Sequence, residues 1–502
     1  MKKSYLKTLG KHKKQLQARL AKKNYADQPC PMFQGGMQYR VSERTGAVNC
    51  GALGVMLTLA QRLGLVKEID DNLKLLKVHL PYHESDHVLN FAFNILAGGF
   101  RLEDLELRRG DEQYMNGLGA QRIPDPTTAG DFTRRFQPTD ILTLQECFNR
   151  TREKVWNQQP IGFLTEAFID VDGTVAETLG ECKEGMEMSH KGIWGYHPLL
   201  VSLANTNEVL YLVNRPGNAV SHLDSVPWMD RAIALVKPYA GSVTVRGDTD
   251  FTHTEHLDRW DAEGTRFILG MDAHAKVVGL ADELPETAWK QLERPPKYEI
   301  TTQERCRPEN VKERIVKERE FKNIVLVGES VAEMDYKPLK TEHSYRLVVL
   351  RKNLTIKKGE LALFDEVRYF FYITNRRDLQ VEEVVSLANQ RSNQENVIAQ
   401  LKGGVNAMRM PVQDLNSNWA YMVMAALAWN LKAWFALLVP ERSRGIELLK
   451  MEFRSFLNAI VLLPAQILKT GRQLLYRLLS YSPWIKDLLA TFERIRGLPL
   501  LR

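Results

Sequence analysis

One helical stretch, residues 381–402, constrains the fold of this chain most, because charged residues interrupt its apolar pattern. It reads VEEVVSLANQRSNQENVIAQLK and is followed by Gly403 and Gly404. Asp378 is a candidate N-cap, two glutamates follow in the first turn, and the paired glycines would end the helix. Its apolar stripe follows helical three-four spacing and contains Val381, Val384, Val385, Ala388, Ile398 and Leu401.

Three charges fall within this stripe. Steps of four and three residues lead from Val384 through Ala388 to Arg391, Glu395 and, after Ile398, Lys402. At ~100° per residue the three charged side chains lie within roughly 40° of one another. Burying a charge without a partner is costly, so such a face normally meets a metal, a counter-charge or an anionic ligand. A partly exposed helix with an internal Arg391–Glu395 ion pair is the alternative.

Length and charge favour a soluble protein of two or three domains. The chain has 502 residues and a net charge of +7. Residues 1–25 carry nine Lys and Arg and no acid, and lack the apolar core of a signal peptide. This basic, helical arm suits nucleic acid, although a merely solvated N-terminus would look the same.

Two further features bear on location. The five cysteines are scattered without a CxxC pair, which predicts reduced core residues in a cytoplasmic protein and no structural zinc. The longest apolar run, residues 420–439, is interrupted by Asn430 and Lys432. It predicts a buried helix, and we expect no membrane association.

The first third of the chain is predicted to be helical. Within it, residues 124–136 read PDPTTAGDFTRRF, a loop followed by a capped helix. Phe132 and Phe136 would face inward while Arg134 and Arg135 project outward. This pattern is compatible with a helix-turn-helix element that places arginines on phosphates, and equally with a solvated helix face.

The middle of the chain changes character. Strands are predicted at residues 163–171, 198–203, 209–214 and 242–246, with a helix at 230–237. Three strands, a helix and a strand indicate a mixed sheet flanked by helices. Asp172 and Asp248 follow the first and fourth strands beside glycine turns, where α/β sheets place their chemistry. Short apolar runs at 266–374 then predict a β-rich insertion, and the chain is helical again from residue 416.

Asp172, Asp248 and Glu395 therefore come from three separate elements. Carboxylates are ligands suited to Mg²⁺, and two such ions can clamp the attacking and leaving oxygens of a phosphoryl transfer. No Walker-type loop is present in the sequence, which argues against a nucleotide hydrolase. A carboxylate pair could also serve glycoside hydrolysis, but Arg391 and Lys402 favour a phosphate-bearing substrate.

The order and spacing of these motifs resemble a known family. From about residue 45 to near the C-terminus, the chain resembles bacterial insertion-sequence transposases of the DDE type. More narrowly, it is similar to the group numbered thirteen-eighty, related to transposases with a Y-R-E-K signature. Ala388 stands where that signature has tyrosine. The motifs that carry the resemblance are Asp172-Gly173-Thr174, Tyr196-His197-Pro198-Leu199, Arg215-Pro216-Gly217-Asn218, Arg246-Gly247-Asp248-Thr249-Asp250-Phe251 and the spaced set Arg391, Glu395 and Lys402.

The resemblance implies an α/β fold with a ribonuclease-H-like core, a mixed sheet flanked by helices and interrupted by a β-rich insertion. The expected regions are a basic arm and helical DNA-end-binding region (1–150), the first part of the core (160–265), the insertion (266–374), the glutamate-bearing helix of the core (375–410) and a helical C-terminal region (411–502).

The resemblance also implies a function. The protein would bind the terminal inverted repeats of its own insertion sequence, cut them and transfer the strands to target DNA, as a homodimer or higher oligomer. Asp172, Asp248 and Glu395 would hold two Mg²⁺ ions, for which Mn²⁺ can substitute. Arg391 and Lys402 would hold phosphates near the scissile bond, and Arg134 and Arg135 are candidates for DNA-end recognition.

Alternatives remain open at the site and for the function. Asp170, two residues before Asp172 on the same strand face, is the rival first ligand, and Asp250 is the rival of Asp248. A ribonuclease-H-like endonuclease without strand transfer is one alternative function. A catalytically inactive DNA-binding protein derived from a transposase is another, against which the intact acids speak.

Overall fold

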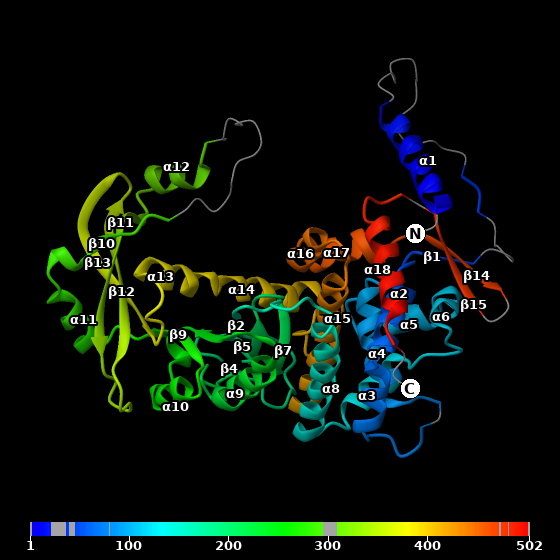
Figure 1. Cartoon of the computed structure of the whole chain (residues 1–502), viewed down its shortest axis with the longest axis horizontal. Coiled ribbons are helices and arrows are strands. Elements are labelled where there is room, and N and C mark those ends of the chain that lie inside the picture. The colour runs from blue at the N-terminus through cyan, green and yellow to red at the C-terminus, as the bar shows by residue number, and fades with distance from the viewer. Residues whose placement is uncertain are drawn as a thin grey trace.

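A nine-stranded mixed sheet runs from one end of the molecule to its middle, in the order β10-β11-β12-β13-β9-β8-β2-β6-β7 (Figure 1). The computed structural model describes residues 3–21, 37–39, 46–79, 81–294, 309–470, 473–479 and 481–499. Helices cover the sheet and continue into a large helical body at one end (Figure 1). The mixed α/β architecture predicted from the sequence is therefore confirmed.

Five strands form one half of this sheet: β7, β6 and β2 are antiparallel neighbours, whereas β2, β8 and β9 are parallel. β6 and β7 are buried along their whole length, as expected for strands covered on both faces. The predicted helix at 230–237 is longer and begins at Ser225. The bounds are β2 Ala167–Gly173, β6 Leu199–Leu203, β7 Glu208–Val213, α9 Ser225–Val236, β8 Val243–Gly247, α10 Leu257–Ala262 and β9 Arg266–Met271. Short strands β3 Ala176–Glu177, β4 Glu187–Met188 and β5 Trp194–Tyr196 form a separate small sheet.

The predicted insertion extends this same sheet. Three long antiparallel strands project beyond it, and β13 joins the core by pairing with β9, with Phe371 opposite Met271. Because β9 is the parallel neighbour of β8, the sequence boundary at residue 266 divides two strands that belong together. The bounds are α11 Ala275–Asp282, β10 Lys290–Gln291, α12 Val311–Glu318, β11 Lys322–Tyr336, β12 Tyr345–Lys358 and β13 Leu361–Thr374.

The stretch predicted as one helix at 381–402 is divided in three. α13 spans Val381–Gln390, α14 spans Ser392–Ala399, and a π-helical turn follows at Gln400–Gly404. The N-cap is Gln380, which forms a capping box with Glu383. Asp378, the predicted cap, is instead held by two hydrogen bonds of 2.8 Å from Arg376. The glycine end of the stretch was predicted correctly.

The helical regions before and after the sheet form one body around α15. This helix spans Leu415–Leu437 and packs against α4, α8, β7 and α16. In the described part of the chain it is the one helix long and apolar enough to cross a membrane, and it is fully buried inside the protein. The helices before the sheet are α1 Lys3–Leu20, α2 Leu53–Arg62, α3 Leu65–Asn72, α4 Glu84–Leu96, α5 Asp104–Arg109, α6 Glu112–Leu118, α7 Pro126–Thr133 and α8 Pro138–Trp156.

The two ends of the chain are also joined by strands. β1 (Gly46–Val48) pairs with β14 (Ala465–Thr470), which forms a hairpin with β15 (Gln473–Leu478). The C-terminal region is thus not purely helical, and it shares its core with the N-terminal region. Its remaining helices are α16 Arg442–Lys450, α17 Phe453–Phe456 and α18 Ile485–Gly497.

The cysteines divide by burial. Cys50 and Cys147 are free thiols in the core, as predicted, whereas Cys182 is free and exposed. Cys30 and Cys306 lie outside the described residues.

Candidate active site at the strand ends

Two aspartates lie at the carboxyl ends of neighbouring parallel strands. β2 and β8 pair with Asp170 opposite Arg246, so Asp172 and Asp248 each lie two residues further along in the same register. Arg391, at the junction of α13 and α14, reaches both of them. Its Nη1 lies 3.1 Å from Asp172 Oδ2, and its Nη2 lies 3.9 Å from Asp248 Oδ2. Arg391 therefore meets counter-charges from both strand-end acids, and the alternative Arg391–Glu395 ion pair is not formed.

Burial shapes the electrostatics of this group. The side chain of Asp172 is 16% exposed and that of Asp248 is 37% exposed. Burial raises the pKa of Asp172 to about 6, with Arg391 opposing this shift and Asp248 adding to it. Burial likewise raises the pKa of Asp248, again against Arg391. Two carboxylates that repel each other thus share one cation.

The rival aspartates have different surroundings. Asp170 is buried and receives two hydrogen bonds from Arg246, Nε to Oδ1 at 2.7 Å and Nη2 to Oδ2 at 2.8 Å. Both of its oxygens are engaged, so Asp170 joins β2 to β8. Asp250 is exposed, and its backbone N–H donates to Asp248 Oδ1 at 3.1 Å. This geometry favours Asp172 and Asp248 as the acids available for chemistry.

Gln394 positions the helix that carries Arg391, a role that sequence reasoning missed. Its buried Nε2 donates to the carbonyl oxygens of Asp170 at 2.9 Å and Leu200 at 3.2 Å. The helix is thereby attached to β2 and β6 just before Asp172. The sequence signal for this role was a polar residue, next to Glu395, at a position within the apolar stripe.

Glu395 itself lies at the exposed edge of α14, one turn after Arg391. The break at Arg391 divides the stretch into two helices, and Gln394 faces inward where the continuous helix predicted Glu395. Lys402 extends from the π-helical turn, and its Nζ donates to the carbonyl of Val175 at 2.7 Å. Burial, with Lys191 nearby, lowers the pKa of Lys402. The structure thus brings Lys402 beside the end of β2.

Arg215 and His197 also support the end of β2. Arg215 donates from Nε to the carbonyl of His197 at 2.9 Å and from Nη1 to two carbonyls of the following loop, those of Ser221 and Leu223, at 2.8 Å each. A Cβ at Gly173 would lie 3.1 Å from His197 Nε2 and 3.4 Å from Arg215 Nη2. Gly173 therefore allows the strand end beside Asp172 to approach both side chains closely. The sequence indicated these residues only through their motifs.

The arginines proposed for DNA-end recognition lie elsewhere. Arg134 and Arg135 follow α7 and are exposed, while Phe132 and Phe136 are buried, as predicted. Arg134 forms an ion pair with Asp131 on the same helix. They belong to the helical body around α15 and not to the group at Asp172.

Chemically, the strand-end group suits a hard cation. Among the described residues, no group of three or more His, Cys, Asp or Glu side chains is arranged to hold a metal ion. Asp172 and Asp248 nevertheless converge on a single positive group, the Arg391 guanidinium. Two carboxylates aimed at one position are oxygen donors of the kind that Mg²⁺ and Mn²⁺ accept. These two residues could hold such an ion.

The fold and site define an α/β protein with paired acids at the ends of adjacent parallel strands. Comparison with known proteins gives the family: residues 41–500 match transposase DDE domain group 1, and the chain belongs to this family. No curated protein matches the chain. Among solved structures, a cryo-EM structure of the piggyBac transposase synaptic complex with hairpin DNA is similar at a TM-score of 0.34 and 12% identity, over 83% of this chain and 84% of that one.

Proposed function

We propose that the protein is a DNA transposase that binds the terminal inverted repeats of its own element and catalyses metal-dependent cleavage and strand transfer. The observation that carries the proposal is the convergence of Asp172 and Asp248 on Arg391 in a chain of the DDE transposase family. The order β7-β6-β2-β8-β9, antiparallel and then parallel, supports a ribonuclease-H-like core.

In this proposal Asp172, Asp248 and Glu395 would hold divalent cations. Bound Mg²⁺ or Mn²⁺ supplies an activated water or hydroxyl and neutralises charge that develops on the phosphate. Glu395 is one helical turn from Arg391, on the helix that Gln394 attaches to β2. In cleavage, a water oxygen bonds to phosphorus and the bond to the 3′-oxygen breaks. In strand transfer, a DNA 3′-hydroxyl takes the place of water.

In this proposal the positively charged side chains of Arg391 and Lys402 contact phosphates. Arg391 donates a hydrogen bond from Nη1 to Asp172, and its Nη2 faces Asp248 at 3.9 Å, whereas a guanidinium has five N–H donors in a planar fork. It can orient both carboxylates and donate to a phosphate oxygen at the same time. Lys402, beside the end of β2, supplies a second positive charge. The nucleophile and the leaving oxygen are then held in line between acids and cations.

DNA is the partner that this chemistry requires, and the proposed working form is a homodimer or higher oligomer that holds two element ends. The exposed helix α1 is compatible with backbone contacts, because it carries basic residues and no acid.

The test is an assay of the purified chain with a duplex that carries the repeats flanking its gene, in Mg²⁺, Mn²⁺ or Ca²⁺. Transposition predicts nicked ends and, with a target plasmid, joined products. Cleavage without joining would favour the endonuclease. Specific binding without cleavage in any of the three ions would favour an inactive DNA-binding protein.

Replacement of Arg391 by Lys tests the role of the planar fork. A lysine keeps the charge, but its three donors sit on one nitrogen and cannot reproduce the spaced, planar fork that faces both carboxylates. We expect the cleavage rate to fall by about 10²-fold, in the range seen when one transition-state donor is lost. End-DNA affinity should remain within about threefold of wild type, since one charge of many phosphate contacts is kept. Single-turnover cleavage and filter binding measure the two effects.

Arg377→Lys is the matched control. Arg377 is an exposed arginine just after β13, and it pairs with Asp335 of β11 at 2.8 Å. It should cut and bind as wild type does. Wild-type cleavage by Arg391→Lys would leave Arg391 with a role in stability only.

A further inference from the structure

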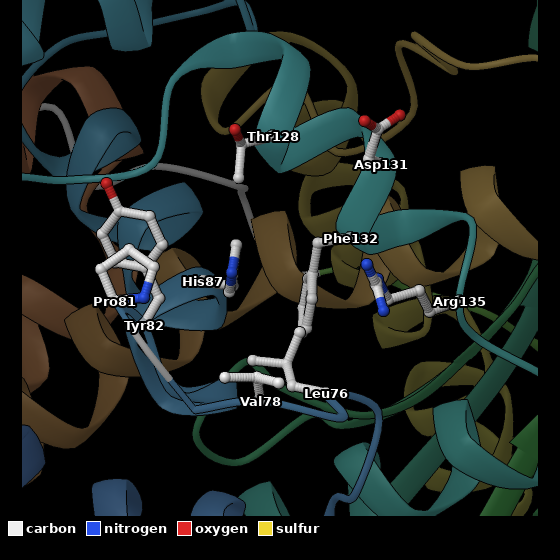
Figure 2. Close-up of a pocket in the computed structure, with 9 residues that line it drawn as sticks. All are labelled: Leu76, Val78, Pro81, Tyr82, His87, Thr128, Asp131, Phe132 and Arg135. Atoms are coloured by element: carbon white, nitrogen blue, oxygen red, sulfur yellow. The ribbon is translucent and has the colours of Figure 1, made fainter.

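A pocket in the helical body is lined by residues that the proposed chemistry does not use. It lies between residues 76–79, residues 81–82, α4 and α7, and has a volume of about 240 Å³ (Figure 2). This is smaller than the roughly 300–1,000 Å³ of pockets for drug-sized ligands, so it suits one small ring system. Its walls are formed by Leu76, Val78, Pro81, Tyr82, His87, Thr128, Asp131, Phe132 and Arg135.

Flat rings dominate its interior. His87 stacks on Phe132 with centroids 4.2 Å apart and planes at 8°. Tyr82 meets His87 edge-on, with centroids 5.5 Å apart. Figure 2 shows these rings facing the same space above Leu76 and Val78. A planar, aromatic guest is the kind of group that such walls stack or clamp.

One polar atom of this interior lacks a partner. His87 is 4% exposed, and its Nδ1 has no hydrogen bond within the described chain. Burial lowers the pKa of His87 to about 4, so the ring is neutral near pH 7 and carries one donor and one acceptor. A buried polar atom without a partner is costly, and because this nitrogen has almost no accessible surface, a guest with a hydrogen-bonding edge satisfies it only when a neighbouring side chain moves aside.

The rim of the pocket carries charges of both signs, one of which is an arginine without an ion pair in the described chain. Asp131 is paired with Arg134, which leaves Arg135 as the charged lining residue without an ion pair among the described residues. The guanidinium of Arg122 lies 5.6 Å from the centre of the Tyr82 ring. The pocket therefore combines aromatic walls with an arginine at its mouth that is unpaired within the described residues, which suits a flat group attached to an anion.

We propose that this pocket binds a single unstacked base of the element's end DNA, with Arg135 on the neighbouring phosphate. The inference rests on the proposed function and specifies how the helical body recognises an end. Base stacking on aromatic side chains and a phosphate contact together supply the binding energy. The base occupies the pocket against the ring surfaces that the contacts among Tyr82, His87 and Phe132 leave free.

The test compares two exposed arginines of the helical body. Arg135 lines the pocket, whereas Arg496 on α18 does not and pairs with Glu493. In Ca²⁺, Arg135→Ala should bind end duplex about tenfold more weakly, and Arg496→Ala within about twofold of wild type. Equal losses in the two variants would overturn the proposal.

A double-mutant cycle tests the base itself. One arm is Tyr82→Leu, which keeps apolar bulk without the ring; the other is an abasic site moved along the end duplex. At one position, the abasic site should lower the affinity of the wild-type protein about tenfold. At that same position it should not lower the already reduced affinity of Tyr82→Leu. Additive losses at every position would overturn the pocket assignment. So would binding of a peptide in the pocket together with unchanged DNA affinity in the Tyr82→Leu variant.

This failure is separable from failure of the proposed function. A chain that cuts and joins end DNA while the cycle stays additive is a transposase whose pocket takes no base. A chain that neither binds nor cuts end DNA disproves both statements. Melting temperatures within about 3 °C of wild type show that each variant is folded.

Discussion

Asp172→Asn is expected to abolish DNA cleavage, whereas Asp170→Asn two residues earlier is expected to destabilise the fold. An asparagine in place of Asp172 would keep the shape of the side chain but lose the charge that holds a divalent cation, so cleavage should fall by at least about 10³-fold. End-DNA affinity should change little, because it comes mainly from phosphate contacts.

The contrast arises from the partners of the two carboxylates. Asp170 is buried against Arg246, which also donates to the carbonyl of Leu387 at 2.9 Å. Removing one charge of a buried pair leaves the other uncompensated and costs about 3–5 kcal/mol. Asp172 is partly exposed and shares Arg391 with Asp248, so its loss leaves that arginine a second acid.

Cleavage of end DNA in Mg²⁺ and urea unfolding measure the two outcomes. Asp248→Asn should behave as Asp172→Asn does. The exposed Asp250→Asn serves as the control and should retain cleavage. Cleavage by Asp172→Asn, together with a folded but inactive Asp170→Asn, would exchange the roles of the two aspartates.

The sheet and the two strand-end acids could be predicted because their signals are local. Strand alternation and glycine turns located β2 and β8 within a few residues, and two acids directly after parallel strands must meet at one edge. The exposed positions of Arg134 and Arg135 followed from the helical spacing of the two phenylalanines.

The rest depended on contacts distant in sequence. The helix breaks at Arg391, whose side chain contacts acids on two strands more than a hundred residues earlier in the sequence. Helical periodicity cannot reveal such contacts. Gln394 finds its acceptors on β2 and β6 for the same reason. The division at residues 1–150 and 411–502 separated segments that share one core, because β1 and β14 pair across almost the whole chain.

A buried ion pair shows how closely the helical body is joined to the sheet. Arg152 on α8 and Glu208 on β7 are fully buried, with Nε 2.9 Å from Oε1. Glu208 also accepts from Trp434 on α15 at 2.8 Å, from Trp156 at 3.0 Å and from Thr206 at 2.6 Å. One carboxylate thus joins three elements, and all four partners are donors.

Glu208→Gln is therefore expected to destabilise the protein by about 3–5 kcal/mol, although glutamine has nearly the same shape. Its amide nitrogen would face donors on one side, and Arg152 would lose its only counter-charge in this group. Urea unfolding followed by tryptophan fluorescence measures the loss.

Glu447→Gln is the matched control, because Glu447 is an exposed acid paired with Arg444 at 2.8 Å. Its loss should cost less than about 1 kcal/mol. The double change Arg152→Met with Glu208→Met should be less destabilising than Glu208→Gln alone, since no buried charge is left without a partner. A Glu208→Gln variant as stable as wild type would mean that this network does not join α8 and α15 to the sheet.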